Sequence, residues 1–237
     1  MRLAEIIRQY AADYRQRYPQ HCTPERARAL QAILHCRSAM APQLLAVCST
    51  CDEQRLIPHS CGHRSCPNCQ HHEGEIWLER QRRLQVPAEY FLLTFTLPSE
   101  LRPLALRAPK SLYSALFAAA WGTVQAFCRK DRQLRGDAGA VAVLHTHSRR
   151  LELHPHIHLA MPAATLDARQ RRWRTKTGYL FNHQALARVF RGKLLAALKA
   201  EGHPLPKQLP VNWVVDCKSV GDGEKALVYL GRYLYRG

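Results

Sequence analysis

The sequence has 237 residues, which is enough for one large domain or for one domain with a small module. Hydrophobic residues make up 46% of it and charged residues 22%, a globular composition that argues against disorder. Lysine and arginine outnumber aspartate and glutamate by 35 to 18, and the resulting net charge of +17 favours a polyanionic partner, most commonly nucleic acid.

Neither a membrane span nor a secretory signal is expected, because no run of 18 apolar residues occurs and the N-terminus lacks an apolar core. Nine cysteines in such a chain favour metal binding over a disulfide framework. We therefore expect a cytoplasmic protein with no membrane partner.

The N-terminal segment predicts two helices. Apolar residues recur at helical spacing over residues 2–18, and a second helix is expected from Pro24 to about Cys36, behind a Thr23 cap. Both are expected to pack together and to expose basic faces.

Two C-x2-C pairs follow, and they predict a structural zinc site. The expected ligands are Cys48, Cys51, Cys66 and Cys69, because two such pairs can present four thiolates in a tetrahedral arrangement. Cys61 and Cys36 lie close enough in the sequence to replace a member of this set. A module of this size has little core, so we expect the metal itself to stabilise it.

The second half of the chain predicts an α+β domain with an antiparallel sheet. A helix at residues 73–84 is interrupted at Val86-Pro87, so the domains are expected at 1–86 and 87–237. Strands are expected at 90–98, 140–146, 152–161 and 211–217; helices at 110–129, 182–201 and 224–234; turns at 136–139 and 221–223; and a basic loop at 165–178.

One strand carries a cluster of histidines. His154, His156 and His158 alternate with apolar residues, so they share one face and can direct imidazoles at one divalent metal ion. A half-buried strand with chance histidines is the alternative. The third ligand is left open: Glu152 is the first candidate, Asp216 and Glu224 are others, and His154 is either a ligand or a partner of one.

The last helix carries Tyr229 and Tyr233, which lie one turn apart on one face. A phenolic oxygen can attack a phosphodiester and keep the strand as a 5′-phosphotyrosine, and two such tyrosines allow two successive transfers. Basic side chains that could contact phosphates are Arg171, Arg172, Arg174, Lys176 and Arg232, with simple solvation as the alternative. Trp173, Tyr179 and Phe181 could stack on bases, although packing is favoured for them.

Together these motifs resemble the HUH-type two-tyrosine transposases of bacterial insertion sequences, the insertion sequence 91 group, with their N-terminal zinc-binding domain. The resemblance covers nearly the whole chain and rests on six segments: Cys48–Cys51, Ser60–Cys69, Phe95–Leu101, Leu144–Thr146, His154–His158 and Tyr229–Gly237. The family's histidine pair falls on His156 and His158, and its tyrosine pair on Tyr229 and Tyr233. A family histidine is replaced by Ser65, with His63 nearby.

The resemblance implies a ferredoxin- or RRM-like nuclease palm with flanking helices, a catalytic Mg²⁺ or Mn²⁺ besides the structural Zn²⁺, and single-stranded DNA at transposon ends and targets as partner. It also implies association with the bacterial nucleoid. Since family members continue past the tyrosine helix, the palm is expected to be incomplete at Gly237.

The expected function is that of a transposase, a metal-dependent single-strand endonuclease and strand transferase. The alternatives are a non-catalytic zinc-dependent DNA-binding fragment and a rolling-circle replication initiator; the zinc module argues against the latter.

Overall fold

The computed structural model describes residues 3–148 and 150–234, except for the side chain of Tyr233. It divides into two compact units, one with the described residues up to Arg80 together with Leu234, and one from Gln81 to Tyr233. The division falls inside helix α3 (Pro67–Leu84), ahead of the domain boundary expected near residue 86. The predicted domain boundary itself stays a prediction.

The first unit begins with the two expected helices. They are α1 (Leu3–Arg17) and α2 (Pro24–His35), separated by the 3-10 turn η1 (Pro19–His21). The Thr23 hydroxyl accepts a hydrogen bond from the Arg26 backbone N–H at 3.4 Å, which satisfies one of the free donors at the start of α2. Both helix predictions and the cap are confirmed.

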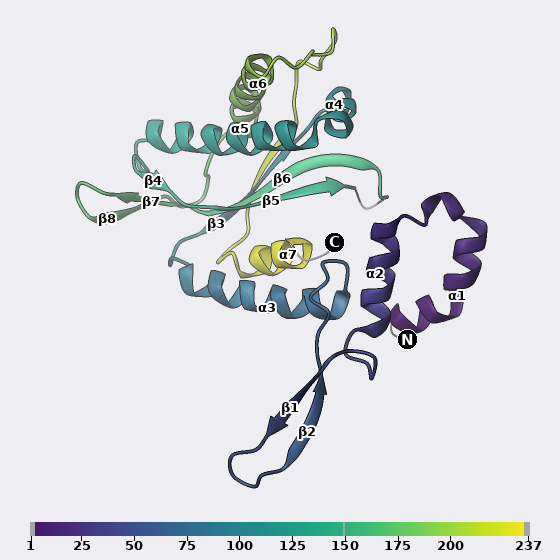
Figure 1. Cartoon of the computed structure of the whole chain (residues 1–237). Helices are drawn as coiled ribbons and strands as arrows, with labels where there is room; N and C mark the ends of the chain where they lie inside the picture. The colour runs from purple at the N-terminus through teal and green to yellow at the C-terminus, as the bar shows by residue number, and fades with distance from the viewer. Residues whose placement is uncertain (1–2, 149, 235–237) are drawn as a thin grey trace. The chain divides into compact units, whose positions relative to one another are not determined.

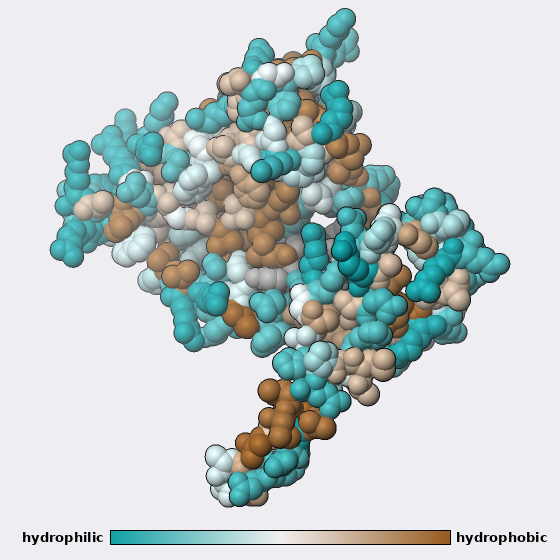
Figure 2. Space-filling model, in the orientation of Figure 1, coloured by the Kyte–Doolittle hydropathy of each residue, from teal (hydrophilic) through white to brown (hydrophobic). Residues whose placement is uncertain are grey.

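An antiparallel hairpin, β1 (Gln43–Val47) with β2 (Gln54–Pro58), lies between α2 and α3. It is not among the predicted elements, because its apolar residues run consecutively instead of alternating. Several of its large apolar side chains are exposed: Leu44, Leu45, Val47, Leu56 and Ile57. Figure 2 shows this hydrophobic surface on the hairpin. The hairpin therefore adds little to the buried core of its unit.

The second unit is built on a four-stranded antiparallel sheet with the order β5-β6-β3-β9. Its strands are β3 (Tyr90–Thr96), β5 (Val141–His147), β6 (Leu153–Pro162) and β9 (Val215–Ser219). Three of them lie where predicted, whereas β9 begins later than residue 211. The predicted α+β class with an antiparallel sheet flanked by helices is confirmed.

One face of this sheet carries the main hydrophobic core. Alternate residues of β3 and β6, among them Phe95, Ile157 and Leu159, are fully buried there against the helices α5 (Pro109–Lys130) and α6 (His183–Ala200). The short elements η2 (Ser99–Leu101) and α4 (Arg102–Arg107) connect β3 to α5. Figure 1 shows α5 and α6 on this side of the sheet.

The opposite face of the sheet carries the histidines and helix α7 (Glu224–Leu234) (Figure 1). The helix begins after Gly223, whose φ of +86° suits glycine, and a Cβ there would meet the Tyr90 ring at 2.5 Å. Ala226, Leu227 and Leu230 are buried, so α7 is tightly packed in this unit. The first helical residue expected in this segment, Glu224, is confirmed.

A second, three-stranded sheet replaces the loop expected at 165–178. Its strands are β4 (Asp137–Ala138), β7 (Ala164–Asp167) and β8 (Arg172–Thr175). The loop prediction was wrong because Thr165 is buried and its hydroxyl donates to the Leu134 carbonyl, a long-range contact that composition does not reveal. The turn expected at 136–139 likewise contains β4. Over the described ranges, none of the helices combines the length and hydropathy that a membrane crossing needs.

Candidate metal centres and active site

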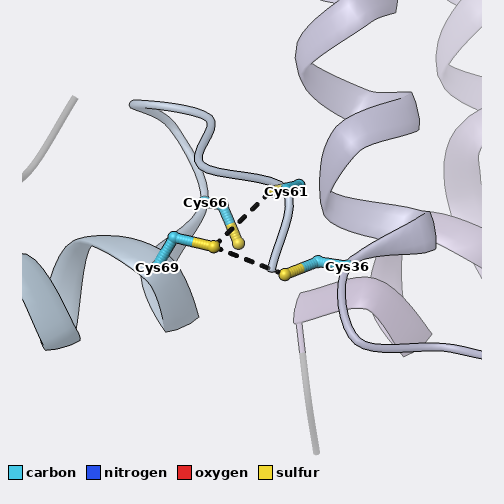
Figure 3. Close-up of side chains that lie close together, drawn as sticks. All are labelled: Cys36, Cys61, Cys66 and Cys69. Atoms are coloured by element: carbon cyan, nitrogen blue, oxygen red, sulfur yellow. Dashed lines mark hydrogen bonds between the residues drawn. The ribbon is translucent and has the colours of Figure 1, made fainter. Parts of the chain in front are cut away.

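Four cysteines converge in the first unit. Cys36 follows α2, Cys61 lies in the loop after β2, and Cys66 and Cys69 lie at the start of α3 (Figure 3). The Cys69 Sγ atom is 3.5 Å from the Cys36 Sγ and 3.6 Å from the Cys61 Sγ, and all four sulfurs lie within 4.8 Å of one another. Thiolates held about 2.3 Å from a tetrahedral zinc ion are roughly 3.8 Å apart, so the cluster fits this ion.

Burial and mutual contact shift the thiol pKa values in opposite directions. Burial raises the pKa of Cys61 to about 12. Burial would also raise that of Cys69, but hydrogen bonds from Cys36, the Gly62 backbone and Cys61 outweigh it and lower its pKa to about 7. Without a metal ion, the cluster therefore favours a thiolate at Cys69 with protonated thiols around it. Four thiolates at these distances would need a cation to offset their repulsion.

The structure does not bring together the cysteines of the two C-x2-C pairs, which were the first ligand set expected for the zinc ion. Cys48 and Cys51 lie in the exposed turn between β1 and β2, where the Cys48 N–H donates to the Glu53 carbonyl at 2.9 Å. The cluster instead holds Cys36 and Cys61, the residues named as alternatives. The hairpin carries the first C-x2-C pair away from the second. The spacing of the cysteines along the chain does not reveal this separation.

Three histidines converge in the second unit. His156 and His158 come from β6, and His145 comes from the neighbouring strand β5, where it pairs with His156. Their ligand atoms lie within 4.8 Å of one another, and His145 and His158 are buried. The structure thus brings together the two predicted ligands with a third imidazole, a donor set that suits a divalent transition-type ion.

Hydrogen bonds orient two of these rings. The His156 Nδ1–H donates to the His154 carbonyl oxygen at 2.7 Å, which leaves the Nε2 lone pair for a ligand. The His158 Nδ1 lies 3.0 Å from the Thr94 hydroxyl on β3, which can accept its proton. Such partners fix the tautomer and orientation of metal-binding histidines, so this trio fits a resident cation.

Burial keeps the trio neutral. It lowers the pKa of His145 to about 3 and that of His158 to about 4, and the neighbouring imidazoles lower both further. The pKa of His156 is also lowered, mainly by burial. All three imidazoles are therefore uncharged at neutral pH, the form that binds metal ions.

Tyr229 lies directly beside the trio. Its ring centroid is 5.8 Å from that of His145 and 5.5 Å from that of His158, with the latter rings nearly perpendicular at 85°. The residue projects from α7, and its side chain is half-buried. Tyr233 lies one turn further along α7, but its side chain is outside the described residues. One predicted nucleophile is thus placed against the predicted metal ligands.

The other ligand candidates lie elsewhere. Glu152 is exposed and immediately precedes β6, which begins at Leu153. Asp216 forms an ion pair with Lys218 at 3.1 Å, and Glu224 forms one with Arg82. The His154 Nδ1 instead accepts from the Arg102 Nη2 at 3.1 Å, outside the trio. None of the three carboxylates therefore joins the three histidines in the candidate metal site.

Sequence reasoning missed His145, Thr94 and Arg102. A signal for the first was available, because the predicted pairing of 140–146 with 152–161 places His145 beside His156 once the register is known. Thr94 and Arg102 have no such signal. Their contacts depend on which strands are neighbours in the sheet and on where α4 begins.

The predicted basic contacts divide into two groups. Arg174 donates from Nε and Nη2 to Asp167 Oδ2 at 2.9 and 2.7 Å, and the Lys176 Nζ donates to Asp131 Oδ2 at 2.6 Å. These two cations stabilise the fold locally. Arg171, Arg172 and Arg232 are exposed. Of the aromatic candidates, Trp173 and Tyr179 are exposed, whereas Phe181 is buried in the core.

Fold and site together define a class of protein: a cysteine-rich metal-binding unit joined to an antiparallel palm with a histidine–tyrosine site. Residues 6–97 match the family model described as "Transposase zinc-binding domain", and residues 139–237 match the one described as "Putative transposase". The chain belongs to the insertion sequence 91 family of transposases.

Similar proteins agree with this membership. Over 260 residues the chain is 32% identical to "Putative transposase y4qJ" of Sinorhizobium fredii, covering 99% of this chain and 64% of the relative. Over 202 residues it is 30% identical to the transposase for insertion sequence element IS801 of Pseudomonas savastanoi pv. phaseolicola, covering 78% and 48%. The chain therefore spans about two thirds or less of the length of these relatives.

Among solved structures, the conjugative relaxase TrwC in complex with mutant OriT DNA is similar, with a TM-score of 0.40 and 22% identity over 52% of this chain and 48% of that chain.

The zinc-binding family model and the four-cysteine cluster together support a structural zinc ion in the first unit.

Proposed function

We propose that this chain is a transposase that cleaves and rejoins single-stranded DNA during rolling-circle transposition, with the 5′ end held on a tyrosine. The observation that carries the proposal is the ring contact of Tyr229 with His145 and His158. It places a phenolic side chain beside three neutral imidazoles that can share one cation.

In the proposed reaction the Tyr229 oxygen attacks the phosphorus of a phosphodiester. The tyrosine hydroxyl gives up its proton as the bond from phosphorus to its oxygen forms. The bond to the 3′ oxygen breaks, and the released strand takes up one proton as its 3′-hydroxyl, so the step is balanced. A bound Mg²⁺ or Mn²⁺ would stabilise the charge on the phosphoryl oxygens. His145, His156 and His158 would hold it, with Thr94 and the His154 carbonyl orienting two of the rings.

Basic side chains would hold the DNA backbone. Arg171, Arg172 and Arg232 are the phosphate contacts we propose, because their guanidinium groups are exposed. Arg102 would add positive charge near the trio, since it contacts His154, whose ring centroid is 5.2 Å from that of His156. Tyr233 would serve as the second nucleophile of the strand-transfer cycle.

The test is a covalent DNA adduct. Single-stranded DNA from the element ends is incubated with the purified chain and Mn²⁺ or Mg²⁺, and adducts are resolved by denaturing electrophoresis. We expect an adduct with the wild type, its loss in Tyr229→Phe and His156→Ala, and its retention in His147→Ala, which alters an exposed histidine of the same strand as His145. Comparison with Tyr233→Phe identifies the tyrosine that attacks first.

Binding of DNA without any adduct would contradict the proposed catalysis. It would favour a non-catalytic zinc-dependent DNA-binding protein, for which the cysteine cluster and the exposed arginines would suffice.

A further inference from the structure

A pocket of about 430 Å³ opens on the histidine side of the main sheet. Tyr90, Val141 and Ala160 contribute to its lining from the strands, and Leu227 from α7. Its volume falls within the range of roughly 300–1,000 Å³ that is typical of pockets for small organic groups. No residue of the histidine trio lines it.

The pocket is close to the trio along the same strand. Ala160 follows His158 by two positions on β6 and therefore faces the same side of the sheet. Two residues of an antiparallel strand span about 7 Å. A strand bound at the trio would therefore bring a neighbouring base to the pocket.

The hairpin β7–β8 contributes an exposed aromatic ring to the pocket. Trp173 is 56% exposed, and it pairs with Leu166, which also lines the pocket. The next residue, Arg174, points to the opposite face of the hairpin because strand residues alternate, and there it pairs with Asp167. An indole left half in solvent at an apolar pocket offers a stacking surface at little cost in conformational entropy.

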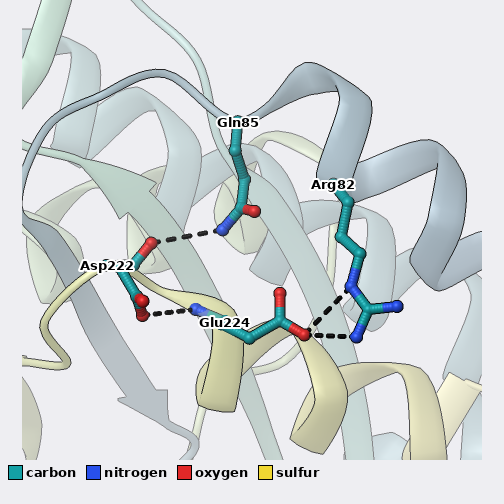
Figure 4. Close-up of polar contacts among 4 residues, drawn as sticks. All are labelled: Arg82, Gln85, Asp222 and Glu224. Carbon is teal, nitrogen blue, oxygen red and sulfur yellow. Dashed lines mark hydrogen bonds and ion pairs between the residues drawn. The ribbon is translucent and has the colours of Figure 1, made fainter.

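The charges around this hairpin suit an anionic chain. Arg169 and Arg171 lie in the exposed turn between β7 and β8, whereas Asp137 is the acidic residue among those that line the pocket. One lining residue, Gln85, is held by a polar contact, and a second contact lies beside it (Figure 4). The Arg82 Nε donates to Glu224 at 3.0 Å, and the Gln85 Nε2 donates to the Asp222 carbonyl at 3.2 Å. These contacts join the end of α3 to the start of α7 on this side of the pocket.

We propose that this pocket binds one unstacked nucleobase of the single strand beside the histidine trio, with the base stacked on Trp173. The inference rests on the proposed function and adds to it a base-binding subsite. A base in a duplex is already stacked on both faces, so the pocket would select for single-stranded DNA.

The first experiment measures binding by fluorescence anisotropy with a fluorescein-labelled single-stranded oligonucleotide from the element end. We expect Trp173→Ala to weaken binding about tenfold and Trp173→Phe to restore most of it, since stacking needs an aromatic face. Tyr10→Ala is the matched control, because Tyr10 is an aromatic residue that is 53% exposed and does not line the pocket. Urea denaturation of each variant shows that the fold is retained.

The second experiment removes the base instead of the indole. Abasic sites are placed one at a time along the oligonucleotide. We expect one position to weaken binding of the wild type and to have no further effect in Trp173→Ala, because the two changes remove the same contact.

Failure of this inference and failure of the proposed function are distinguishable. If the wild type binds the strand and forms the adduct, but Trp173→Ala behaves like Tyr10→Ala, the base pocket is overturned and the function stands. If Trp173→Ala and one abasic position both weaken binding but no adduct forms, the pocket stands and the catalysis falls. Equal affinity of the wild type for single strand and duplex would overturn the pocket.

Discussion

The cysteine cluster and the histidine trio are both sets of metal-binding side chains, but different forces hold them in place. Around the cysteines the buried residues are few: Ile33, Cys66 and Cys69, with Ala4, Ile7, Cys36 and Cys61 partly buried. The thiols themselves are thus a large part of this core. The histidines instead lie on a sheet whose opposite face carries the main hydrophobic core.

This difference implies opposite relations between metal and fold. In the first unit the metal should create the structure, because the apolar surface available for burial is small and β1–β2 exposes much of it. In the second unit the structure should create the metal site, because backbone pairing and core packing orient the rings before any ion binds.

Removal of zinc should have the largest effect. Structural zinc contributes about 10–16 kcal/mol in small zinc modules, so chelation or Cys69→Ser is expected to unfold the first unit. Hydrogen exchange measures this outcome: amides of α2 and of the start of α3 should lose protection, whereas those of β3 and β6 should keep it. Cys48→Ser is the matched control and should leave protection unchanged. Equal loss in both variants would instead identify Cys48 as a zinc ligand.

Core truncation should act on the second unit. Leu159→Ala is expected to lower its free energy of unfolding by about 2–5 kcal/mol, because the side chain is 1% exposed and its removal leaves a cavity. Urea denaturation measures the change. Leu151→Ala, at a site that is 82% exposed, should change it by less than about 0.5 kcal/mol. A loss of hydrogen-exchange protection in α2 after Leu159→Ala would contradict an effect confined to the second unit.

Loss of one imidazole should affect metal affinity more than folding. His145→Ala is expected to weaken Mn²⁺ binding at least about tenfold, since it removes one of three ligands. Isothermal titration calorimetry measures the affinity, and His147→Ala, an exposed site on the same strand, is the control. If His145→Ala binds Mn²⁺ as tightly as the control does, the third ligand is not His145.

The smallest expected effect is on the pH dependence of stability. Burial would raise the pKa of Asp131, but hydrogen bonds from Lys176 and from the Gln133 and Leu134 backbone lower it overall. A carboxyl whose pKa is lowered by folding stabilises the folded state above its unfolded pKa of about 3.9, and this contribution disappears as the pH falls below that value.

Asp131→Asn keeps a side-chain oxygen for the two backbone donors and removes the charge. We expect it to lower the free energy of unfolding by about 1 kcal/mol at pH 7, and the difference from the wild type to shrink as the pH falls below the unfolded pKa of about 3.9. Urea denaturation across this pH range measures it. A difference that does not depend on pH would contradict a role for the charge.

The sequence alone determined the elements whose signals are local. The Thr23 cap, the apolar strand β3, the helix α5 and the alternation of His156 with His158 each depend on residues a few positions apart, and the structure shows them as expected. The family followed from the same motifs. The roles of the predicted site residues stay predictions until the variants above are measured.

Only the tertiary structure decided which distant segments meet. The pairing of β5 with β6 brings His145 to His156, the packing of α7 brings Tyr229 to the trio, and the β1–β2 hairpin separates Cys48 from Cys66. Strand register and helix packing depend on the apolar surface buried across the whole core. That burial involves residues far apart in the sequence, so a short segment cannot predict it.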